Sequence, residues 1–222
     1  GQVAGCARHT HGWGHQGGYA VAVNSRHLFI SGRMINEGGH LEDPDTWPPA
    51  GSDWIGVSRR PLEDIRQAAP FAGAKGAKGD TLKGAFLVVD EVPTGSKALD
   101  RRVANIAGLA ASSNRLWAAC PYDGTIKVFD ADTMQRREVW RFERAGGLAV
   151  APDGTLWALQ DGDAGHPSRV AALDAAGRPA GPEFRFDLPA DPASMCFASD
   201  GRLLVADDGP RQQVLLFERT AA

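Results

Sequence analysis

Residues 147–159 read Gly-Leu-Ala-Val-Ala-Pro-Asp-Gly-Thr-Leu-Trp-Ala-Leu, an apolar run, a tight polar turn and a second apolar run. Asp153-Gly154 is a dipeptide that supplies the positive φ angles required by the shortest hairpin turns. Apolar runs of four to six residues on either side of such a turn indicate two paired strands. The stretch therefore predicts an antiparallel β-hairpin with a buried face.

The same pattern recurs three more times along the chain. Each copy has an apolar strand, a turn rich in Asn, Asp, Ser or Gly, and a second apolar strand, and the copies span residues 19–30, 108–120 and 195–207. When Phe29, Trp117, Trp157 and Leu204 are matched, the copies are 88, 40 and 47 residues apart. A period of 40 to 50 residues is typical of a four-stranded propeller blade.

Two further apolar segments follow each hairpin except the last, where only one is visible. We therefore expect an all-β fold, a β-propeller of about four four-stranded blades. The expected blades span about residues 19–92 (with insertions at 33–53 and 60–84), 105–143, 146–188 and, incompletely, 193–218. The four are expected to belong to a larger propeller of six to eight blades. The alternative is a closed four-bladed ring, in which residues 2–7 supply the missing last strand.

The last repeat carries a family resemblance. Residues 197–217 contain an Asp-Gly turn, then Val205-Ala206-Asp207, a polar loop and an apolar strand, and this order resembles an NHL repeat. The resemblance covers roughly residues 105–217 and extends to six-bladed propellers of the gluconolactonase type. It implies the fold and leaves the activity open, because such propellers host lactonases, lyases, and protein- and RNA-binding modules.

In a blade whose strands are lettered a to d from the axis outward, the loops entering strand a and the loops between b and c emerge on one face, called here the top face. The loop at residues 9–18 enters the first blade there and contains three of the six histidines. Imidazole and carboxylate groups together suit a divalent metal. The predicted metal ligands are His9, His11, His15 and His40. Their spacing matches no established zinc motif, and histidines among glycines also bond to backbone carbonyls or stack on tryptophan.

The insertion at 33–53 and the remaining b–c loops also belong to the top face. Exposed tryptophans beside amide and carboxylate groups are suited to sugar rings, and carboxylates in such loops also simply cap turns. The predicted ligand-binding residues are His11, Trp13, Gln16, Asn36, Glu37, Trp47, Tyr122, Asp161 and Asp207. Carboxylates at Asp123, Asp163 and Asp208 and the imidazole of His166 are expected on the same face. No nucleophile elbow, phosphate-binding loop or HExxH motif occurs.

Composition narrows the partners. The chain has 24 basic and 27 acidic residues, without a basic stripe, which argues against nucleic acid. It has no apolar run of about 18 residues, so we expect no membrane span. The expected partners are a glycan or protein ligand, together with further blades or neighbouring domains. Gly1 indicates a processed or excised chain, and a secreted or periplasmic location is slightly favoured; neither location nor oligomeric state follows from the residues.

Three function hypotheses follow. The first is a ligand-binding propeller module with a site built by residues 9–18 and 33–53. The second is a metal-dependent hydrolase or lyase, for which a divalent metal would be the cofactor and no motif assigns catalytic residues. The third is a structural domain that positions a neighbour.

Cysteine and tryptophan positions add expectations about burial. Cys120 and Cys196 lie in apolar runs and are expected to be buried free thiols, with a disulfide as the alternative. Trp54, Trp117 and Trp157 lie inside strands and are expected in the core. Trp140 lies in an outer strand and is expected to be half-buried.

Overall fold

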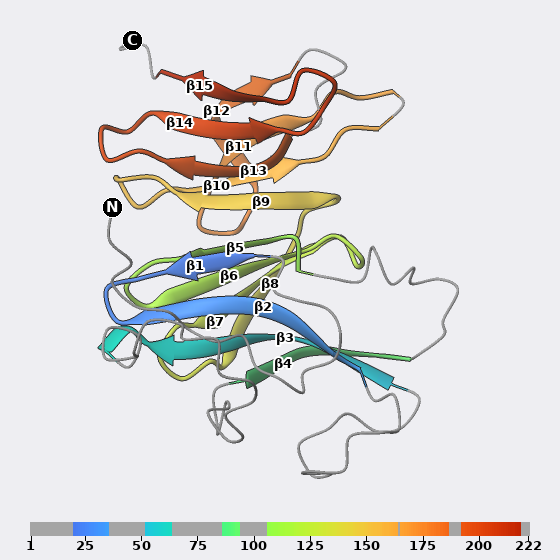
Figure 1. The fold of residues 1–222 in the computed structure, drawn as a ribbon, viewed down its shortest axis with the longest axis vertical. Helices are drawn as coiled ribbons and strands as arrows, with labels where there is room; N and C mark the ends of the chain where they lie inside the picture. Colours follow the sequence, from blue (N-terminus) through green and yellow to red (C-terminus); the bar gives the residue numbers. More distant parts are fainter. Residues whose placement is uncertain are drawn as a thin grey trace, which may run out of the picture. The chain divides into compact units, whose positions relative to one another are not determined.

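The structure, a computed structural model, describes residues 20–35, 52–63, 86–93, 106–163, 165–186 and 192–218. The strands of these residues form four antiparallel sheets, three with four strands and one with three. In each sheet, strands that follow one another in the sequence lie side by side. The fold is therefore all-β, with four meander sheets as the blades of a propeller (Figure 1).

Blade 1 lies in the first of two compact units, residues 1–106, and is described by itself. Its strands are β1 (Val21–Val23), β2 (His27–Ile35), β3 (Ser52–Pro61) and β4 (Phe86–Pro93). The turn between β1 and β2 is held by Asn24, whose Oδ1 accepts hydrogen bonds from the backbone N–H groups of Arg26 and His27, at 2.9 and 2.7 Å. Asn24 thus acts as the turn residue that the repeat predicts.

Blades 2, 3 and 4 form the second unit, residues 107–222. The strands of blade 2 are β5 (Gly108–Ala111), β6 (Arg115–Cys120), β7 (Thr125–Asp130) and β8 (Arg136–Arg141). Those of blade 3 are β9 (Ala145–Val150), β10 (Leu156–Gln160), β11 (Arg169–Leu173) and β12 (Pro179–Arg185). Blade 4 has three strands among the described residues, β13 (Pro192–Phe197), β14 (Leu203–Asp207) and β15 (Gln213–Phe217).

The Asp-Gly turns have the backbone that the sequence predicts. Gly154 and Gly201 have φ angles of 86° and 87°. Asp153 and Asp200 each accept a hydrogen bond from the backbone N–H two residues later, at 3.0 and 3.1 Å. These short-range bonds set the register of β9 with β10 and of β13 with β14.

The first strands of blades 2, 3 and 4 lie next to one another, with β9 between β5 and β13 (Figure 1). One hydrophobic core fills the space between blades 2 and 3 and contains Trp117, Ile126, Leu148 and Leu156. A second core fills the space between blades 3 and 4 and contains Trp157, Leu159, Val170 and Val205. Face-to-face packing of successive sheets is the arrangement that defines a propeller.

The burial of the tryptophan side chains confirms two of the expectations and corrects a third. Trp117 and Trp157 are buried, as predicted. Trp140 was expected to be half-buried but is only 6% exposed. The turn after β11 covers its ring, since a Cβ on Gly177 would collide with the indole. The side chain of Trp54 lies outside the described set.

Cys120 and Cys196 are both free thiols, and Cys120 is fully buried as expected. Cys196 contradicts the expectation, because its side chain is exposed on β13. It points to the side of blade 4 that blade 3 does not cover. In the part of the chain that the structure describes, no helix has the length and hydropathy required to cross a membrane.

Candidate functional site

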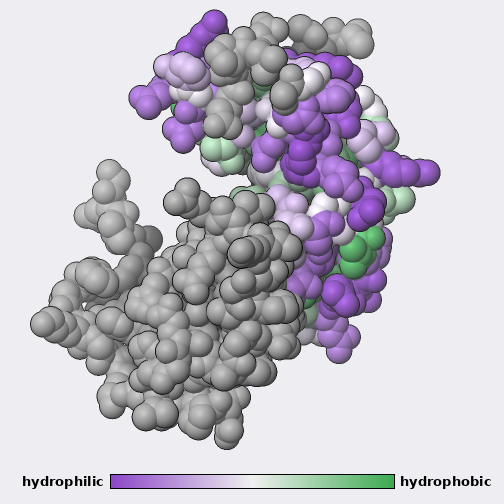
Figure 2. Space-filling view, turned by 90° about the vertical axis from the view of Figure 1, so that its right-hand side faces the viewer, coloured by the Kyte–Doolittle hydropathy of each residue, from purple (hydrophilic) through white to green (hydrophobic). Residues whose placement is uncertain are grey.

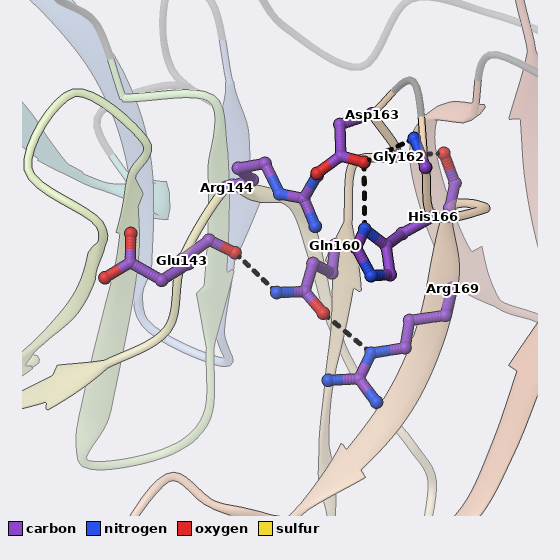
Figure 3. A network of polar contacts seen from close by, with 9 residues as sticks. Glu143, Arg144, Gln160, Gly162, Asp163, His166 and Arg169 are labelled. Carbon is purple, nitrogen blue, oxygen red and sulfur yellow. Dashed lines mark hydrogen bonds and ion pairs between the residues drawn. The ribbon is translucent and has the colours of Figure 1, made fainter.

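Blade 3 presents a polar site on the top face, built by two loops that meet above β9 and β10 (Figure 3). The first is the short connection Glu143–Arg144 that leads from β8 into β9. The second is the loop at 161–168 between β10 and β11. The backbone N–H of Asp161 donates to the Arg144 carbonyl at 3.0 Å, which ties the second loop to the first.

Arg144 has a φ angle of 54°, in the left-handed region that non-glycine residues seldom adopt. Such strain persists only where the surroundings hold it, and it is frequent at functional sites. Its guanidinium Nη1 donates to Oδ2 of Asp163. The strained backbone thus aims the Arg144 side chain across the loop of the next hairpin.

Asp163 is the hub of this site. Its Oδ1 accepts from the Gly165 backbone N–H at 2.9 Å and lies 3.0 Å from Nδ1 of His166. Backbone hydrogen bonds between Asp163 and His166 close the loop in both directions. The Gly165 hydrogen bond, the His166 ring and the Arg144 charge lower the pKa of Asp163 from 3.8 to about 2.

An ionised Asp163 decides the orientation of the His166 ring. A carboxylate only accepts hydrogen bonds, so the neutral ring places its proton on Nδ1 and leaves Nε2 as an acceptor. The His166 side chain is 76% exposed, whereas Arg144 and Asp163 are 36% and 48% exposed. The oriented imidazole of His166 is therefore exposed to solvent, beside the guanidinium of Arg144 that is paired with Asp163.

A second chain of contacts runs outward from the same loops (Figure 3). The Gln160 side-chain NH₂ donates to the Glu143 carbonyl at 2.8 Å, and its Oε1 accepts from Nε of Arg169 at 2.6 Å. Arg169 also pairs with Glu183 of β12 at 2.7 Å. These contacts join β10, β11 and β12 to the connection that leads from blade 2 into blade 3.

The corresponding loop of blade 2 is anchored by a buried lysine. The Lys127 side chain is 3% exposed, and its Nζ lies 2.6 Å from Oδ2 of Asp123 and 3.4 Å from the Tyr122 hydroxyl. The Thr125 hydroxyl donates to the other Asp123 oxygen at 2.6 Å. A buried charge with this many partners holds Tyr122 and Asp123 in defined positions. A Cβ on Gly124 would lie 2.5 Å from Oε2 of the Glu143 carboxylate, so this loop adjoins the blade 3 site.

Three of the predicted ligand-binding residues lie in the described part of the chain. Tyr122 is half-buried on Lys127, and Asp161 is exposed with its carboxylate against β9 near Gly146. Asp207 is 4% exposed, and its oxygens accept from the Gly209 N–H and the Gln213 amide, both at 3.1 Å. Asp207 therefore caps its own loop, in agreement with the alternative that carboxylates in these loops cap turns. Six predicted ligand-binding residues lie outside the described residues: His11, Trp13, Gln16, Asn36, Glu37 and Trp47.

The predicted metal ligands His9, His11, His15 and His40 also lie outside the described residues. Within the residues that the structure describes, no group of three or more His, Cys, Asp or Glu side chains is arranged to hold a metal ion. The prediction of a metal site at these four histidines stays a prediction.

A pocket lies between blades 3 and 4 at the face opposite the top face, beside the turns at 151–155 and 198–202. This pocket has a volume of about 260 Å³ and is lined by Trp157, Phe184, Phe197 and Phe217. The rings contact one another, with Trp157 stacked on Phe184 at 5.7 Å and Phe184 5.1 Å from Phe217. The pocket is the uncovered end of the core between these blades.

Reasoning from the sequence missed Arg144, Gln160, Arg169 and Glu183. Arg144 and Glu143 stand in the loop that enters a strand a, and the face rule alone places that loop at the top. Gln160 is the last residue of β10 and Arg169 is the first residue of β11, so both flank a b–c loop. Polar residues at the ends of two otherwise apolar strands were the signal in the sequence that could have identified them. Over the described residues the surface in Figure 2 is mostly hydrophilic, so polarity alone does not single them out.

The carboxyl of Asp163 is expected to titrate near pH 2, which carbon NMR of the carboxyl group measures. Because the pKa in the folded state lies below its ordinary value of 3.8, the loop is stabilised above that value and loses this stabilisation as pH falls from 3.8 to about 2. His166→Ala should raise the pKa of Asp163. Arg178→Ala removes an exposed ion pair with Asp174 elsewhere in blade 3 and should leave the pKa of Asp163 unchanged. A wild-type midpoint near 3.8 would contradict the assigned contacts.

No protein-family model matches the sequence, and a search of curated proteins found no relative. Among solved structures, the chain is similar to the hydrazine synthase of Kuenenia stuttgartiensis, with 14% identity over 96% of this chain and 49% of that one, at a TM-score of 0.50. It is also similar to virginiamycin B lyase from Staphylococcus aureus, with 14% identity, 92% and 71% coverage and a TM-score of 0.44. A streptogramin B lyase matches with 13% identity, 93% and 84% coverage and a TM-score of 0.44.

These similarities concern the fold. At 14% identity, a shared architecture does not carry an activity from one protein to the other. The chain spans about half the length of the hydrazine synthase chain that it matches, 49%.

Proposed function

We propose that this chain is a ligand-binding propeller module that holds a polar ligand, a glycan or a segment of a protein partner, on its top face. The observation that carries the proposal is the Arg144–Asp163–His166 site. Three polar side chains from two loops are held together there, one of them on a strained backbone, while the imidazole stays 76% exposed. Function is often placed in loops that a rigid scaffold positions.

The chemistry of the site favours hydroxyl-rich ligands. A guanidinium, a carboxylate and an amide side chain donate to and accept from pairs of hydroxyl groups, and an aromatic ring offers a flat apolar face. Tyr122 supplies such a ring in the adjoining loop of blade 2, held by Lys127 at 5.2 Å from the ring centre. The predicted contribution of the loops at 9–18 and 33–53, with Trp13 and Trp47, concerns residues outside the described set and stays a prediction.

The second candidate is an enzyme of the hydrolase or lyase type, as in the gluconolactonase-like propellers that the NHL-like repeat resembles. The observation that favours it is the Asp163–His166 pair, since a carboxylate that orients Nδ1 leaves Nε2 as a candidate general base. A divalent metal on the predicted histidines would be its cofactor. Elemental analysis of the purified chain separates the two functions, because a stoichiometric ion lost on His11→Ala is expected only of the metal-dependent enzyme.

A glycan array probed with the labelled chain tests the binding function. The double substitution Arg144→Ala and His166→Ala is expected to weaken binding to any glycan that the wild type recognises by at least about tenfold, because two hydrogen-bonding groups to a desolvated ligand are lost. Arg202→Ala is the matched control, since Arg202 forms a somewhat more exposed ion pair with Asp200 in a turn at the opposite face. Equal binding by the double variant and the wild type would place the ligand elsewhere, and a blank array, with no titratable protein partner, would favour a structural role.

A further inference from the structure

The aromatic pocket between blades 3 and 4 lies at the face opposite the proposed top-face site, and the proposed function does not use it. Its volume is about 260 Å³, and every residue that lines it belongs to the described part of these two blades. An apolar cavity of about 150 Å³ already accepts benzene. The pocket therefore has room for one ring-sized body with a short side chain.

Four aromatic side chains form the walls of this pocket. Trp157 stacks on Phe184 with an interplanar angle of 18° and meets Phe197 edge-on, with ring centres 5.8 Å apart. Phe217 lies 5.1 Å from Phe184. Trp157 is 7% exposed, whereas the three phenylalanines are half-buried and remain partly open to solvent. Apolar and aromatic walls with a few polar groups are typical of small-molecule sites.

Two of these rings are peculiar to this pair of blades. In the repeat, Phe197 and Phe217 stand where blade 3 has Val150 and Leu173. Those two aliphatic side chains pack in the core between blades 2 and 3. Stacking of the blades thus needs only aliphatic residues at these positions. The rings add negatively polarised faces that attract cations, which aliphatic side chains lack.

Acidic side chains gather at the mouth of the pocket. Asp153 and Asp200 line it, and of its described lining residues none is basic. Asp200 is 51% exposed and pairs with Arg202 at 2.7 Å. Hydrogen bonds from the Arg202 side chain and backbone lower the pKa of Asp200, while the bond to Asp200 and the nearby charge of Glu218 raise the pKa of Arg202. Three carboxylates therefore stand against one guanidinium, which leaves the mouth with a net negative charge.

We propose that this pocket binds a small organic cation, an ammonium group on an apolar body of about one ring. The body lies against the four aromatic rings. The ammonium group sits at the mouth, where it meets both the negative faces of the rings and the carboxylates of Asp153 and Asp200. The site lies on the other face from the site at the top of blade 3, so it does not depend on the proposed function.

Three ligands of nearly the same size test the proposal: phenethylammonium, phenethyl alcohol and phenylpropionate. At neutral pH they carry the same phenyl body with a positive, a neutral and a negative end. Binding to the whole chain is followed by NMR titration at the backbone amides of Gly201 and Leu203, which line the pocket. We expect the ammonium ion to bind at least about tenfold more tightly than the alcohol, because hydrogen bonds between charged groups are stronger, and the propionate to bind most weakly.

Substitutions separate the charge at the mouth from the apolar walls. Asp153→Asn together with Asp200→Asn keeps an oxygen for each turn hydrogen bond, and it should lower the affinity for the ammonium ion to that for the alcohol. Asp174→Asn is the matched control and should change neither affinity, because Asp174 also caps a turn and pairs with an arginine but does not line the pocket. Phe197→Val, which introduces the residue of the matching position in blade 3, should weaken binding of both ligands by at least about threefold.

The proposal is wrong if neither amide responds to the ammonium ion up to about 10 mM, a concentration at which even a millimolar site is mostly filled. Equal affinities for the three ligands would also overturn it, since the pocket would then take apolar bodies without regard to charge. Ammonium binding that survives the double substitution, or that Asp174→Asn weakens equally, would mean that the mouth does not hold the cation. If the double variant loses its strand signal in circular dichroism, the three ligands on the wild type still decide.

The two proposed sites can fail separately. Arg144→Ala with His166→Ala removes the polar groups of the top-face site and should leave the affinity for the ammonium ion unchanged. The double substitution at Asp153 and Asp200 should likewise leave binding at the top face unchanged.

Discussion

Replacement of Trp157 by alanine is expected to lower the free energy of unfolding by about 3–5 kcal/mol, the usual cost of truncating a buried aromatic residue. Trp157 is 7% exposed between blades 3 and 4. Its indole stacks on Phe184 with ring centres 5.7 Å apart and meets the edge of Phe197 at 5.8 Å. Removal of the ring therefore leaves a cavity bounded by two sheets, which cannot close without moving a whole blade.

Urea unfolding followed by tryptophan fluorescence and circular dichroism measures this loss. Val139→Ala is the control, because a side chain that is 51% exposed should change the stability by no more than about 0.5 kcal/mol. A loss below about 1 kcal/mol for Trp157→Ala would show that blades 3 and 4 do not share a packed core. A change in the slope of the transition would indicate that blade 4 unfolds separately.

Gly108→Ala is expected to destabilise the chain by about 1–3 kcal/mol or more, because it overpacks a contact between backbones. Gly108 begins β5, the innermost strand of blade 2. A Cβ there would collide with the Gly146 carbonyl and lie 2.9 Å from the Leu148 nitrogen and 3.0 Å from the Gly147 Cα, all in β9. Backbone atoms of a paired strand cannot swing aside as a flexible side chain can, so blades 2 and 3 must separate.

Gly165→Ala is the matched control for this substitution. A Cβ on Gly165 would meet only Asp163 Oδ1, at an ordinary 3.7 Å. Thermal unfolding of both variants compares the same chemical change at a closed and an open position. Equal melting temperatures for Gly108→Ala and the wild type would mean that the innermost strands lie further apart than described.

The repeat was readable from the sequence because its information is local. An Asp-Gly dipeptide between two short apolar runs specifies a hairpin, and Gly154 and Gly201 have the positive φ that this turn requires. Trp117 and Trp157 stand at the same place in two copies, which predicted their burial correctly. Strand pairing between neighbours in the sequence needs no knowledge of distant residues.

The errors at Trp140 and Cys196 have a common origin. Burial in a blade depends on the sheet packed against it, and that sheet is formed by other strands than the one that carries the residue. Trp140 is covered by the turn at Gly177 of the next blade, and Cys196 is exposed because it lies on the face of β13 that points away from blade 3. An apolar run predicts a strand but not which of its faces is covered.

The candidate site was only partly predictable for the same reason. The order of strands in a blade assigns its loops to one face or the other, and this rule predicted that Asp161, Asp163, His166 and Tyr122 lie on the top face. The partners that orient them could not be predicted, because Arg144 lies 19 residues from Asp163 and reaches it only when β9 and β10 pair. A strained φ at Arg144 leaves no mark in the residue type.

The amino-acid sequence by itself determined the strands, their turns and the all-β propeller, because apolar alternation and turn residues act over a few neighbouring positions. Tertiary structure alone decided which polar groups meet at the top of blade 3, how Asp163 keeps its charge, and which face of β13 exposes Cys196. Those outcomes depend on how whole sheets stack. The free energy of stacking is distributed over many residues far apart in the chain, so no short segment encodes it.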